Sequence, residues 1–448
     1  MAENVLIIGG GLAGLAAATA LAPRGFQVTL LESRGRLGGR AGSFQDSASG
    51  QLIDTCQHLS MGCCTNFAYF CHTVGIEHLL KPQPSLYFMT PDRRISCLKG
   101  DPLPAPFHLA RAFLGAHYLS PAEKLRIAWG LACLERTRPE ADPPLLDWLL
   151  HHGQTPRTRE RFWGVVLKST LNESIERVGL RYARKVFLDG FLRHRRGFEI
   201  GLPTVPLGRL YGDELQHWLR EHSVDLQLNC AVTDITIMDK RVQRLALRGG
   251  NSAKADWYIA AVPFDRLLNL LPAAVAEAHS YFSNLRRLET SPITSVHLWY
   301  DRPVTNLPHV VLIDCEGQWV FNRGEMRSGE HYLQVVVSAA RQFRGYGHEE
   351  VQRRISAEVA RLFPAATLSA LCRARVVTEQ GATFSAVPGV DQWRPRQTSP
   401  IHNLFVAGDW TATDWPATME GAVRSGYLAA EGLLNCLGRS ESLVQSDL

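Results

Sequence analysis

The first forty residues alternate between apolar runs and glycine-rich or polar segments. Residues 5–8 (VLII) form a continuous apolar run, which is typical of a buried strand. Residues 9–14 (GGGLAG) interrupt it, and the small apolar residues 15–21 follow with the texture of a tightly packed helix. A second apolar run, 27–31, ends at Glu32. The pattern predicts a strand, a glycine-rich turn, a helix and a second strand in that order.

Between residues 81 and 202 the apolar positions recur at helical spacing, with several proline breaks. The segment Ser120-Pro121-Ala122-Glu123 has the pattern of a capping box with proline at the first helical position, so it predicts a helix over 124–134. Residues 107–119 are apolar and aromatic with basic residues interspersed. This stretch fits either an interfacial helix that dips into a membrane or guards a lipid tunnel, or an amphipathic helix packed on the protein's own core.

The glycine-rich turn has the spacing of a dinucleotide-binding fingerprint. Gly9 allows the tight turn, Gly11 lets a pyrophosphate approach the backbone, and Gly14 lets the helix pack close to the strand. The helix N-terminus then offers free N–H groups to the phosphates. Glu32 at the tip of the second strand suits ribose hydroxyls and disfavours the 2′-phosphate of NADP.

A second glycine-rich region lies almost 400 residues later, at 404–426, and includes Gly408-Asp409 and Glu420-Gly421-Ala422. The presence of both regions indicates FAD, because each region would hold one end of that molecule. Together with Gly38-Gly39-Arg40, Val232 and Ala255-Asp256, they resemble the FAD-dependent amine oxidase and phytoene desaturase superfamily. The resemblance covers nearly the whole chain. It implies that Asp409 binds the ribityl and pyrophosphate part, and that the helix beginning near Met419 points its N-terminus at the flavin.

The resemblance implies an α/β fold: a Rossmann-like FAD-binding domain of the amine oxidase type, with an inserted mixed β-sheet substrate domain and a helical subdomain. We expect residues 1–80, 203–265 and 396–440 to form the discontinuous FAD domain, residues 81–202 the helical subdomain that faces substrate or membrane, and residues 266–395 the mixed domain. The tail 440–448 is predicted to be disordered. The cofactor-binding candidates are Gly9, Gly11, Leu12, Ala13, Gly14, Glu32, Ser33, Arg34, Gly38, Gly39, Arg40, Val232, Gly408, Asp409, Thr418, Met419 and Ala422.

More local motifs resemble the squalene-associated FAD-dependent desaturases, which act as hydroxysqualene dehydroxylases of hopanoid biosynthesis. These motifs are Asp54-x-x-Gln57-His58, Leu171-Asn172, 382–384 (ATF) and 415–426 (WPATMEGAVRSG). Asp414 departs from the pattern, because a glycine precedes the Trp-Pro pair in that family. The resemblance implies that reduced FAD delivers a hydride to an allylic carbon of hydroxysqualene while the hydroxyl leaves as water, giving squalene. No cysteine lies next to the C-terminal motif, so we expect FAD to be bound non-covalently.

That reaction calls for a few polar groups beside the flavin, within an apolar tunnel. The catalytic candidates are Asp54, Gln57, His58 and Trp415. Asp54 and His58 would form a carboxylate–imidazole pair, or else a structural network that orients their loop. Trp415 is expected close to the flavin plane. Asn172 would either reach the substrate hydroxyl or cap a helix, and the tunnel aromatics would include Trp163, Phe187, Phe191, Trp299 and Phe384.

Composition narrows the remaining classes of function. The chain has 448 residues, 45% hydrophobic and 20% charged, and its net charge of +5 gives no case for nucleic acid but would not repel an anionic membrane. No apolar run is long enough to span a bilayer, and the early first strand leaves no room for a signal peptide. We therefore expect a cytoplasmic protein with at most peripheral contact to the inner face of the cell membrane. The ten cysteines include no C-x-x-C pair, so we expect reduced, packed thiols and no metal site.

Two alternatives stay open at this level. A carotenoid or phytoene-type desaturase would have the same fold and cofactor and would move the hydride from a C–H bond to oxidised FAD. A non-catalytic prenyl-binding protein of the GDP-dissociation-inhibitor type would share the fold but not the intact cofactor signature. No second fingerprint for NAD(P)H is evident, so the electron donor is unidentified.

Overall fold

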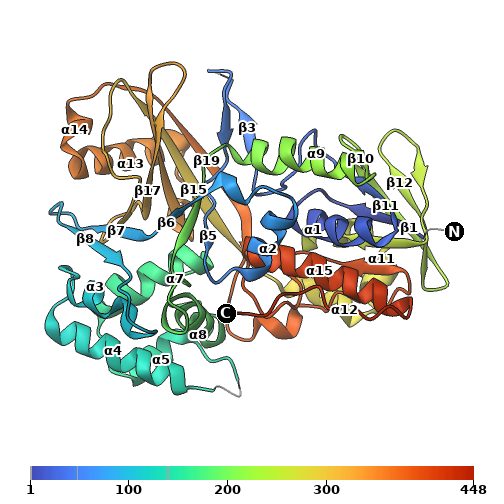
Figure 1. Ribbon diagram of the computed structural model, residues 1–448, viewed down its shortest axis with the longest axis horizontal. Helices are drawn as coiled ribbons and strands as arrows, with labels where there is room; N and C mark the ends of the chain where they lie inside the picture. The colour runs from blue at the N-terminus through green and yellow to red at the C-terminus, as the bar shows by residue number, and fades with distance from the viewer. Residues whose placement is uncertain (1–2, 48, 139–140) are drawn as a thin grey trace.

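The computed structural model describes residues 3–47, 49–138 and 141–448. A parallel five-stranded sheet forms the centre of one half of the molecule, on the right in Figure 1. Its order is β10 (Asp225–Gln227), β2 (Gln27–Leu31), β1 (Asn4–Ile8), β14 (Trp257–Ala260) and β20 (Leu404–Val406). These strands come from three distant parts of the chain. The predicted strand–turn–helix–strand unit is present, with α1 (Leu12–Leu21) between β1 and β2.

Helices cover this parallel sheet, and α1 is buried along its whole length. Its neighbour α15 (Met419–Cys436) approaches closely because Gly426 has no side chain: a Cβ there would lie 2.2 Å from the carbonyl oxygen of Ala13. The other elements of this half are α2 (Thr65–Thr73), a π-helical turn (Arg209–Asp213), α9 (Glu214–Glu221), the small sheet β11 (Val232–Met238), β12 (Arg241–Leu247) and β13 (Ser252–Ala253), and the helices α10 (Phe264–Leu270), α11 (Ala273–Ala278) and α12 (Ser280–Ser283).

The other half is built on a mixed seven-stranded sheet. Its order is β19 (Leu371–Phe384), β15 (Thr290–Tyr300), β18 (His331–Ser338), β17 (Trp319–Glu325), β16 (His309–Leu312), β7 (Ser85–Met89) and β8 (Ile95–Lys99). One face packs on α13 (His348–Leu362) and α14 (Pro364–Thr367) through an aliphatic core. Two small sheets join the halves: β3 (Ser43–Gln45) with β4 (Leu52–Asp54), and β5 (Ser60–Met61) with β9 (Ile200–Pro203) and β6 (Leu80–Gln83).

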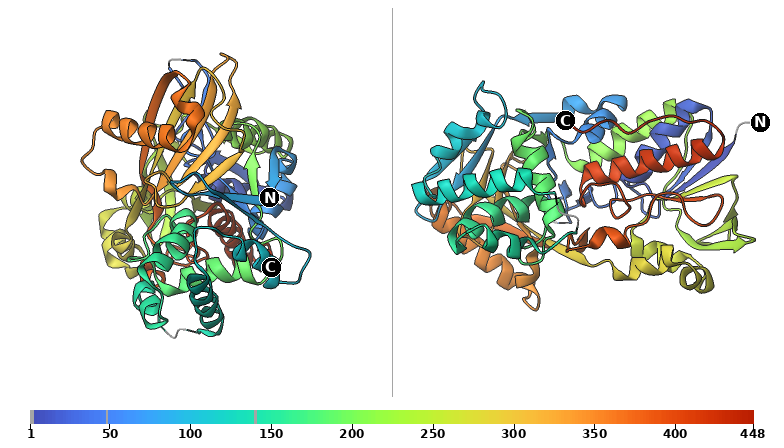
Figure 2. Two further views of the ribbon diagram at one scale, coloured as in Figure 1. Left: turned by 90° about the vertical axis from the view of Figure 1, so that its left-hand side faces the viewer. Right: turned by 90° about the horizontal axis from the view of Figure 1, so that it is seen from below.

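A layer of short helices lies over the opposite face of the seven-stranded sheet, at the lower left of Figure 1 and at the far end from the N-terminus in the right-hand view of Figure 2. Its elements are α3 (Ala110–Leu114), α4 (Pro121–Arg136), α5 (Leu145–His151), α6 (Pro156–Thr158), α7 (Gly164–Leu171) and α8 (Leu180–Phe187), with π-helical turns at Arg159–Trp163 and Leu188–Leu192. The predicted capping box is confirmed at the start of α4, where Ser120 and Glu123 hydrogen-bond each other's backbone.

The structure corrects three details of the sequence analysis. The segment 81–202 is not helical throughout, because β7 and β8 lie within it and extend the mixed sheet. Residues 107–119 form no long helix, only a 3₁₀ turn at Phe107–Leu109 followed by the five-residue α3. The tail 440–448 packs back along α15 (Figure 1), with the backbone N–H of Leu443 2.6 Å from Glu431 Oε1.

Candidate functional site

A cavity of about 810 Å³ opens at the carboxyl ends of β1, β2 and β14. Ligands bind at this edge in open sheets of parallel strands, because the strands end there and the following helices begin. All of the predicted cofactor-binding residues except Gly14 are in its wall: Gly9, Gly11, Leu12, Ala13, Glu32, Ser33, Arg34, Gly38, Gly39, Arg40, Val232, Gly408, Asp409, Thr418, Met419 and Ala422. Gly14 stands behind the wall.

The glycine-rich turn at residues 9–14, which we call the glycine cradle, borders this cavity. Gly9 has φ +109°, and a Cβ there would lie 2.5 Å from the Ala261 carbonyl oxygen. At Gly14 a Cβ would lie 2.0 Å from the carbonyl oxygen of Gly9, so this glycine is required for the helix to pack. At Gly11 a Cβ would meet only the Cα of Gly39, 4.0 Å away. Its missing side chain therefore leaves room for a ligand rather than for other parts of the protein.

The carboxylate of Glu32 organises one end of this cavity. It is 6% exposed, and its Oε2 accepts a hydrogen bond from the backbone N–H of Gly10 at 2.8 Å. Its Oε1 accepts from the N–H of Arg34 at 2.8 Å and from the Ser33 hydroxyl at 3.1 Å. Val232 at the start of β11 is in the wall of the same cavity. This arrangement fits the ribose and adenine half of a dinucleotide.

The second glycine-rich region supplies the other wall. Asp409 is buried and lies 2.6 Å from Arg40, whose guanidinium also donates to the Ala382 carbonyl at 2.8 Å. Burial by itself lowers the pKa of Arg40, but the adjacent Asp409 carboxylate reverses this, so the net effect is a raised pKa and a permanent cation. The hydroxyl of Thr418 caps α15 by accepting from the N–H of Gly421 at 3.1 Å. The positive end of this helix begins at the cavity wall.

Other residues of the 404–426 region stabilise neighbouring parts of the fold. The Glu420 carboxylate is fully buried and accepts from the backbone N–H groups of Asn66 (3.2 Å) and Phe67 (2.7 Å), so it caps the start of α2. Burial raises the pKa of Glu420, although these donors oppose the shift. Ser425 donates to Ala422 and accepts from the N–H of Gly408 at 2.8 Å. Part of the 404–426 motif thus serves to place α15 rather than to touch a ligand.

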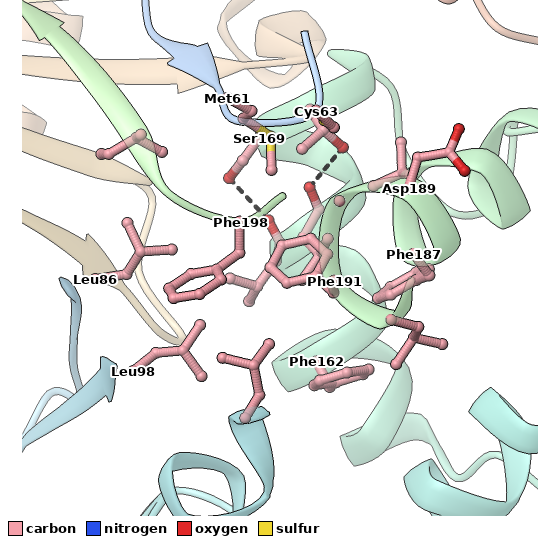
Figure 3. A pocket seen from close by; sticks show the side chains of 18 of the residues that line it. Met61, Cys63, Leu86, Leu98, Phe162, Ser169, Phe187, Asp189, Phe191 and Phe198 are labelled. Atoms are coloured by element: carbon pink, nitrogen blue, oxygen red, sulfur yellow. Dashed lines mark hydrogen bonds between the residues drawn. The ribbon is translucent and has the colours of Figure 1, made fainter. Parts of the chain in front are cut away.

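A second cavity, of about 550 Å³ and almost wholly apolar, lies between the helical layer and the seven-stranded sheet. Figure 3 shows Leu86 and Leu98 from the sheet on one side, with Phe162, Phe187 and Phe191 from the helices on the other. The two cavities adjoin. Six residues belong to the walls of both: Leu59, Ser169, Thr170, Trp319, Thr418 and Met419.

Comparison with known proteins agrees with this geometry. The sequence profile of the family described as "Flavin containing amine oxidoreductase" matches residues 12–434. The chain belongs to the flavin-containing amine oxidoreductase family. Its cofactor is FAD, and the glycine cradle, the Glu32 carboxylate and the Arg40–Asp409 pair fit that molecule.

Several curated relatives match over almost the entire chain. A 15-cis-phytoene desaturase from an Oncidium hybrid cultivar is 29% identical, covering 99% of this chain and 80% of the relative. The 15-cis-phytoene desaturase of Synechococcus elongatus is 27% identical, with 96% of each chain covered. The zeta-carotene desaturase of Synechocystis is 26% identical, covering 98% of this chain and 99% of the relative.

Solved structures share the fold. An oxidoreductase from Methanosarcina mazei superposes with a TM-score of 0.74 at 16% identity, covering 94% of this chain and 98% of its own. Cyclohexylamine oxidase from Brevibacterium oxydans gives a TM-score of 0.69 at 18% identity, covering 98% and 100%. The α/β fold with a mixed substrate sheet is therefore as predicted.

The four catalytic candidates of this flavoprotein do not share one cavity. Gln57 and His58 are in the wall of the FAD cavity, close to Leu59 at the junction. Trp415 is in the wall of the apolar cavity instead, where its indole N–H donates to Asp447 at 3.3 Å and Lys185 Nζ lies 4.3 Å from the ring centroid. Asp54 is buried behind the FAD cavity and is in neither wall.

The expected hydrogen-bonded pair of Asp54 and His58 does not form. Asp54 Oδ1 accepts from the Ser43 hydroxyl at 2.6 Å and from the Leu207 N–H at 2.7 Å, while Oδ2 lies 3.0 Å from Arg323. These partners use both oxygens of the carboxylate. Asp54 therefore belongs to a structural network that orients its loop, which was the second of the two expected alternatives.

His58 is held by its own loop. Its Nδ1 lies 3.0 Å from the carbonyl oxygen of Cys56, which can only accept a hydrogen bond, so Nδ1 carries the proton. The neutral ring then keeps its lone pair on Nε2. Burial lowers the pKa of His58, which also favours the neutral form. In this state the ring is suited to accept a proton.

The structure also decides several smaller expectations. Asn172 ends α7 at φ +52°, and its side chain hydrogen-bonds Ser291, Thr383 and Ala339, so it caps the helix and ties it to the sheet. Asp414, at φ +59°, pairs with Arg181 while its side chain is 80% exposed. This backbone conformation favours glycine, which explains the glycine of the related pattern without a role at the flavin.

Of the five tunnel aromatics, Phe187 and Phe191 are in the wall of the apolar cavity; Trp163, Trp299 and Phe384 are buried elsewhere.

Sequence reasoning missed Arg394, which has no exposed side-chain surface. Its guanidinium donates to the carbonyls of Asp409 (3.0 Å) and Trp415 (2.8 Å), and it pairs with Asp391 at 2.9 Å. One side chain therefore holds the loop that carries Asp409. The buried role of Arg394 could not be predicted from the sequence, because an isolated arginine 15 residues before Asp409 resembles any surface arginine.

Among the residues that the structure describes, no group of three or more His, Cys, Asp or Glu side chains could hold a metal ion. In the same described part of the chain, none of the helices combines the length and the apolar composition needed to cross a membrane.

Proposed function

We propose that this flavoprotein moves a hydride between FAD and an allylic carbon of a long isoprenoid hydrocarbon. The observation that carries this proposal is the apolar cavity, which meets the FAD cavity through shared wall residues. A small polar amine would make few contacts with the aromatic and aliphatic wall of the apolar cavity, whereas a polyene chain would bury its own apolar surface against that wall. The names of the curated relatives, phytoene and zeta-carotene desaturases, support the same substrate class.

Desaturation is the direction that the whole-chain similarity supports better. In that reaction a C–H bond gives up its hydride to oxidised FAD, and the neighbouring carbon loses a proton as the double bond forms. A base must take that proton. Neutral His58, with its Nε2 lone pair free, is in the wall of the cavity where this step would occur.

Reductive dehydroxylation of hydroxysqualene to squalene is the second candidate, favoured by the residue pattern at 415–426. There the allylic carbon accepts a hydride from reduced FAD, and the hydroxyl takes up a proton and leaves as water. The Thr170 hydroxyl is in the wall shared by both cavities; it donates to the Val166 carbonyl at 2.9 Å, so it would bind the substrate hydroxyl as an acceptor. This direction requires an electron donor that reduces FAD.

One pair of incubations distinguishes the two directions. Purified holoprotein is incubated with phytoene and a quinone acceptor, or anaerobically with hydroxysqualene and chemically reduced FAD, and the products are identified by mass spectrometry. A product with additional conjugated double bonds supports desaturation, and squalene supports dehydroxylation. If neither product forms and both lipids fail to bind, the isoprenoid proposal is wrong, while the fold and the cofactor are unaffected.

The proposed lipid substrate leads us to propose a peripheral membrane contact as well. Five large apolar side chains are more than half exposed on the helical layer: Phe107 (63%), Leu114 (67%), Leu125 (73%), Trp129 (63%) and Leu150 (52%). Phe107 is also in the wall of the apolar cavity. An apolar surface beside the substrate cavity would let a lipid enter directly from a bilayer.

We expect the double variant Leu114→Glu/Trp129→Glu to bind anionic vesicles about tenfold more weakly, because each substitution removes an apolar side chain from the contact and adds a negative charge. Vesicle co-sedimentation measures the change. Met238→Glu is the matched control, since Met238 is 61% exposed but lies on the β11–β12 hairpin in the other half of the molecule. Equal binding by all three proteins would contradict the proposed surface.

A further inference from the structure

Arg323 lies behind the wall of the FAD cavity, at an irregular point of β17. The pairing of β17 with β18 shifts register between Asn322 and Gly324, which marks a β-bulge at Arg323. Gly324 has φ +79°, a conformation that suits glycine. Bulges re-aim a side chain relative to the regular strand. Here Arg323 reaches two residues of the Asp54-x-x-Gln57-His58 segment.

The two contacts of Arg323 have different consequences. Its Nη2 lies 3.0 Å from Asp54 Oδ2, and its side chain is only 17% exposed. Its Nη1 donates to the side-chain oxygen of Gln57. Asp54 is itself held by Ser43 and by the N–H of Leu207, so the carboxylate anchors the guanidinium in front of Gln57.

This contact fixes which end of the Gln57 amide is available to a ligand. An arginine side chain has only donors, so the amide oxygen of Gln57 must face it. The amide NH₂ group then points away from Arg323, and one of its two hydrogens is used by the His58 carbonyl at 3.2 Å. Gln57 is 7% exposed and in the FAD cavity wall. It can therefore offer a bound ligand the remaining N–H of its amide as a donor.

We propose that Arg323 is a positioning residue that holds Gln57 as a hydrogen-bond donor to the flavin ring, and thereby favours the reduced, more electron-rich ring. The ring end of FAD is assigned here because Gln57 lies next to the junction with the apolar cavity, whereas Glu32 and the glycine cradle lie at the other end. A donor backed by a cation binds an electron-rich acceptor more strongly than a neutral one. The inference depends on FAD binding alone and holds for either direction of hydride transfer.

A double-mutant cycle on the flavin tests the proposal without any substrate. The variants are Arg323→Met, Gln57→Leu and the two combined; binding of oxidised and reduced FAD to apoprotein and the midpoint potential of the holoprotein are measured. We expect each single variant to weaken binding of reduced FAD about tenfold, and of oxidised FAD less, so that the midpoint potential becomes more negative. Because Arg323 acts through Gln57, the combined variant should match Gln57→Leu.

Arg373→Met is the matched control, since Arg373 is also a largely buried arginine (20% exposed) paired with a buried carboxylate, Asp46, but is in neither cavity wall and does not contact Gln57. It should lower thermal stability and leave the midpoint potential unchanged. If Arg323→Met alone is insoluble because Asp54 is left as an unpaired buried charge, Arg323→Met/Asp54→Asn replaces it in the cycle. The proposal is wrong if Arg323→Met leaves the potential unchanged, or if it lowers the potential equally with and without Gln57. Failure here would leave the isoprenoid proposal standing, because the incubations with lipids measure products instead.

Discussion

Gly11→Ala should yield a folded protein that no longer retains FAD. A Cβ at this position meets nothing closer than the Cα of Gly39 at 4.0 Å, and the backbone φ of −76° is acceptable for alanine. The free energy of unfolding of the apoprotein should therefore change by no more than about 1 kcal/mol. The added methyl group stands where the pyrophosphate must approach, so several charge-assisted hydrogen bonds are lost. We expect the FAD dissociation constant to rise about a hundredfold or more.

Gly14→Ala, only three residues away, provides the contrast. Its Cβ would lie 2.0 Å from the carbonyl oxygen of Gly9, so α1 must move away from β1. We expect a loss of about 3 kcal/mol in the free energy of unfolding, even without cofactor. Urea unfolding of both apoproteins and titration with FAD separate the effects. If Gly11→Ala also unfolds the apoprotein, Gly11 has a packing role instead.

This contrast shows why the N-terminal unit could be predicted from sequence. Three of the four glycines at 9–14 meet a local requirement: a positive φ at Gly9, helix packing at Gly14 and ligand access at Gly11. Such requirements depend on neighbours within a few residues, so they are visible in the spacing alone. The capping box at Ser120 was predictable for the same reason.

What could not be predicted depends on contacts between distant segments. The spacing of Asp54 and His58 suggested a pair, but Ser43, Leu207 and Arg323 occupy the carboxylate, and two of these lie more than 150 residues away. Strands β7 and β8 were missed because they pair at the edge of a sheet whose other strands begin 200 residues later. The tail beyond residue 440 was expected to be disordered on its polarity, but Glu431 and Asn66 bind its backbone.

Arg394 is the most consequential of these distant contacts. It reaches the backbone of the loop that runs from Asp409 to Trp415, and it lies 4.6 Å above the Phe384 ring. The loop's carbonyls are buried with it, so they have no access to water as an alternative partner. The Asp409 carboxylate that pairs with Arg40 is positioned by the same loop.

Arg394→Met should therefore lower the free energy of unfolding by about 3–5 kcal/mol, because the buried carbonyls of Asp409, Thr411 and Trp415 lose their donor at once. FAD content should fall with it, since the wall that carries Asp409 is no longer held. Denaturant unfolding and the absorbance of bound flavin measure the two effects. Arg353→Met is the matched control: Arg353 also pairs with an acidic neighbour, Glu350, but is 72% exposed, so its loss should leave the free energy of unfolding nearly unchanged. Similar stability losses in the two variants would mean that burial of Arg394 does not determine its contribution, and an Arg394→Met protein that keeps its full FAD content would show that the loop holds its shape without it.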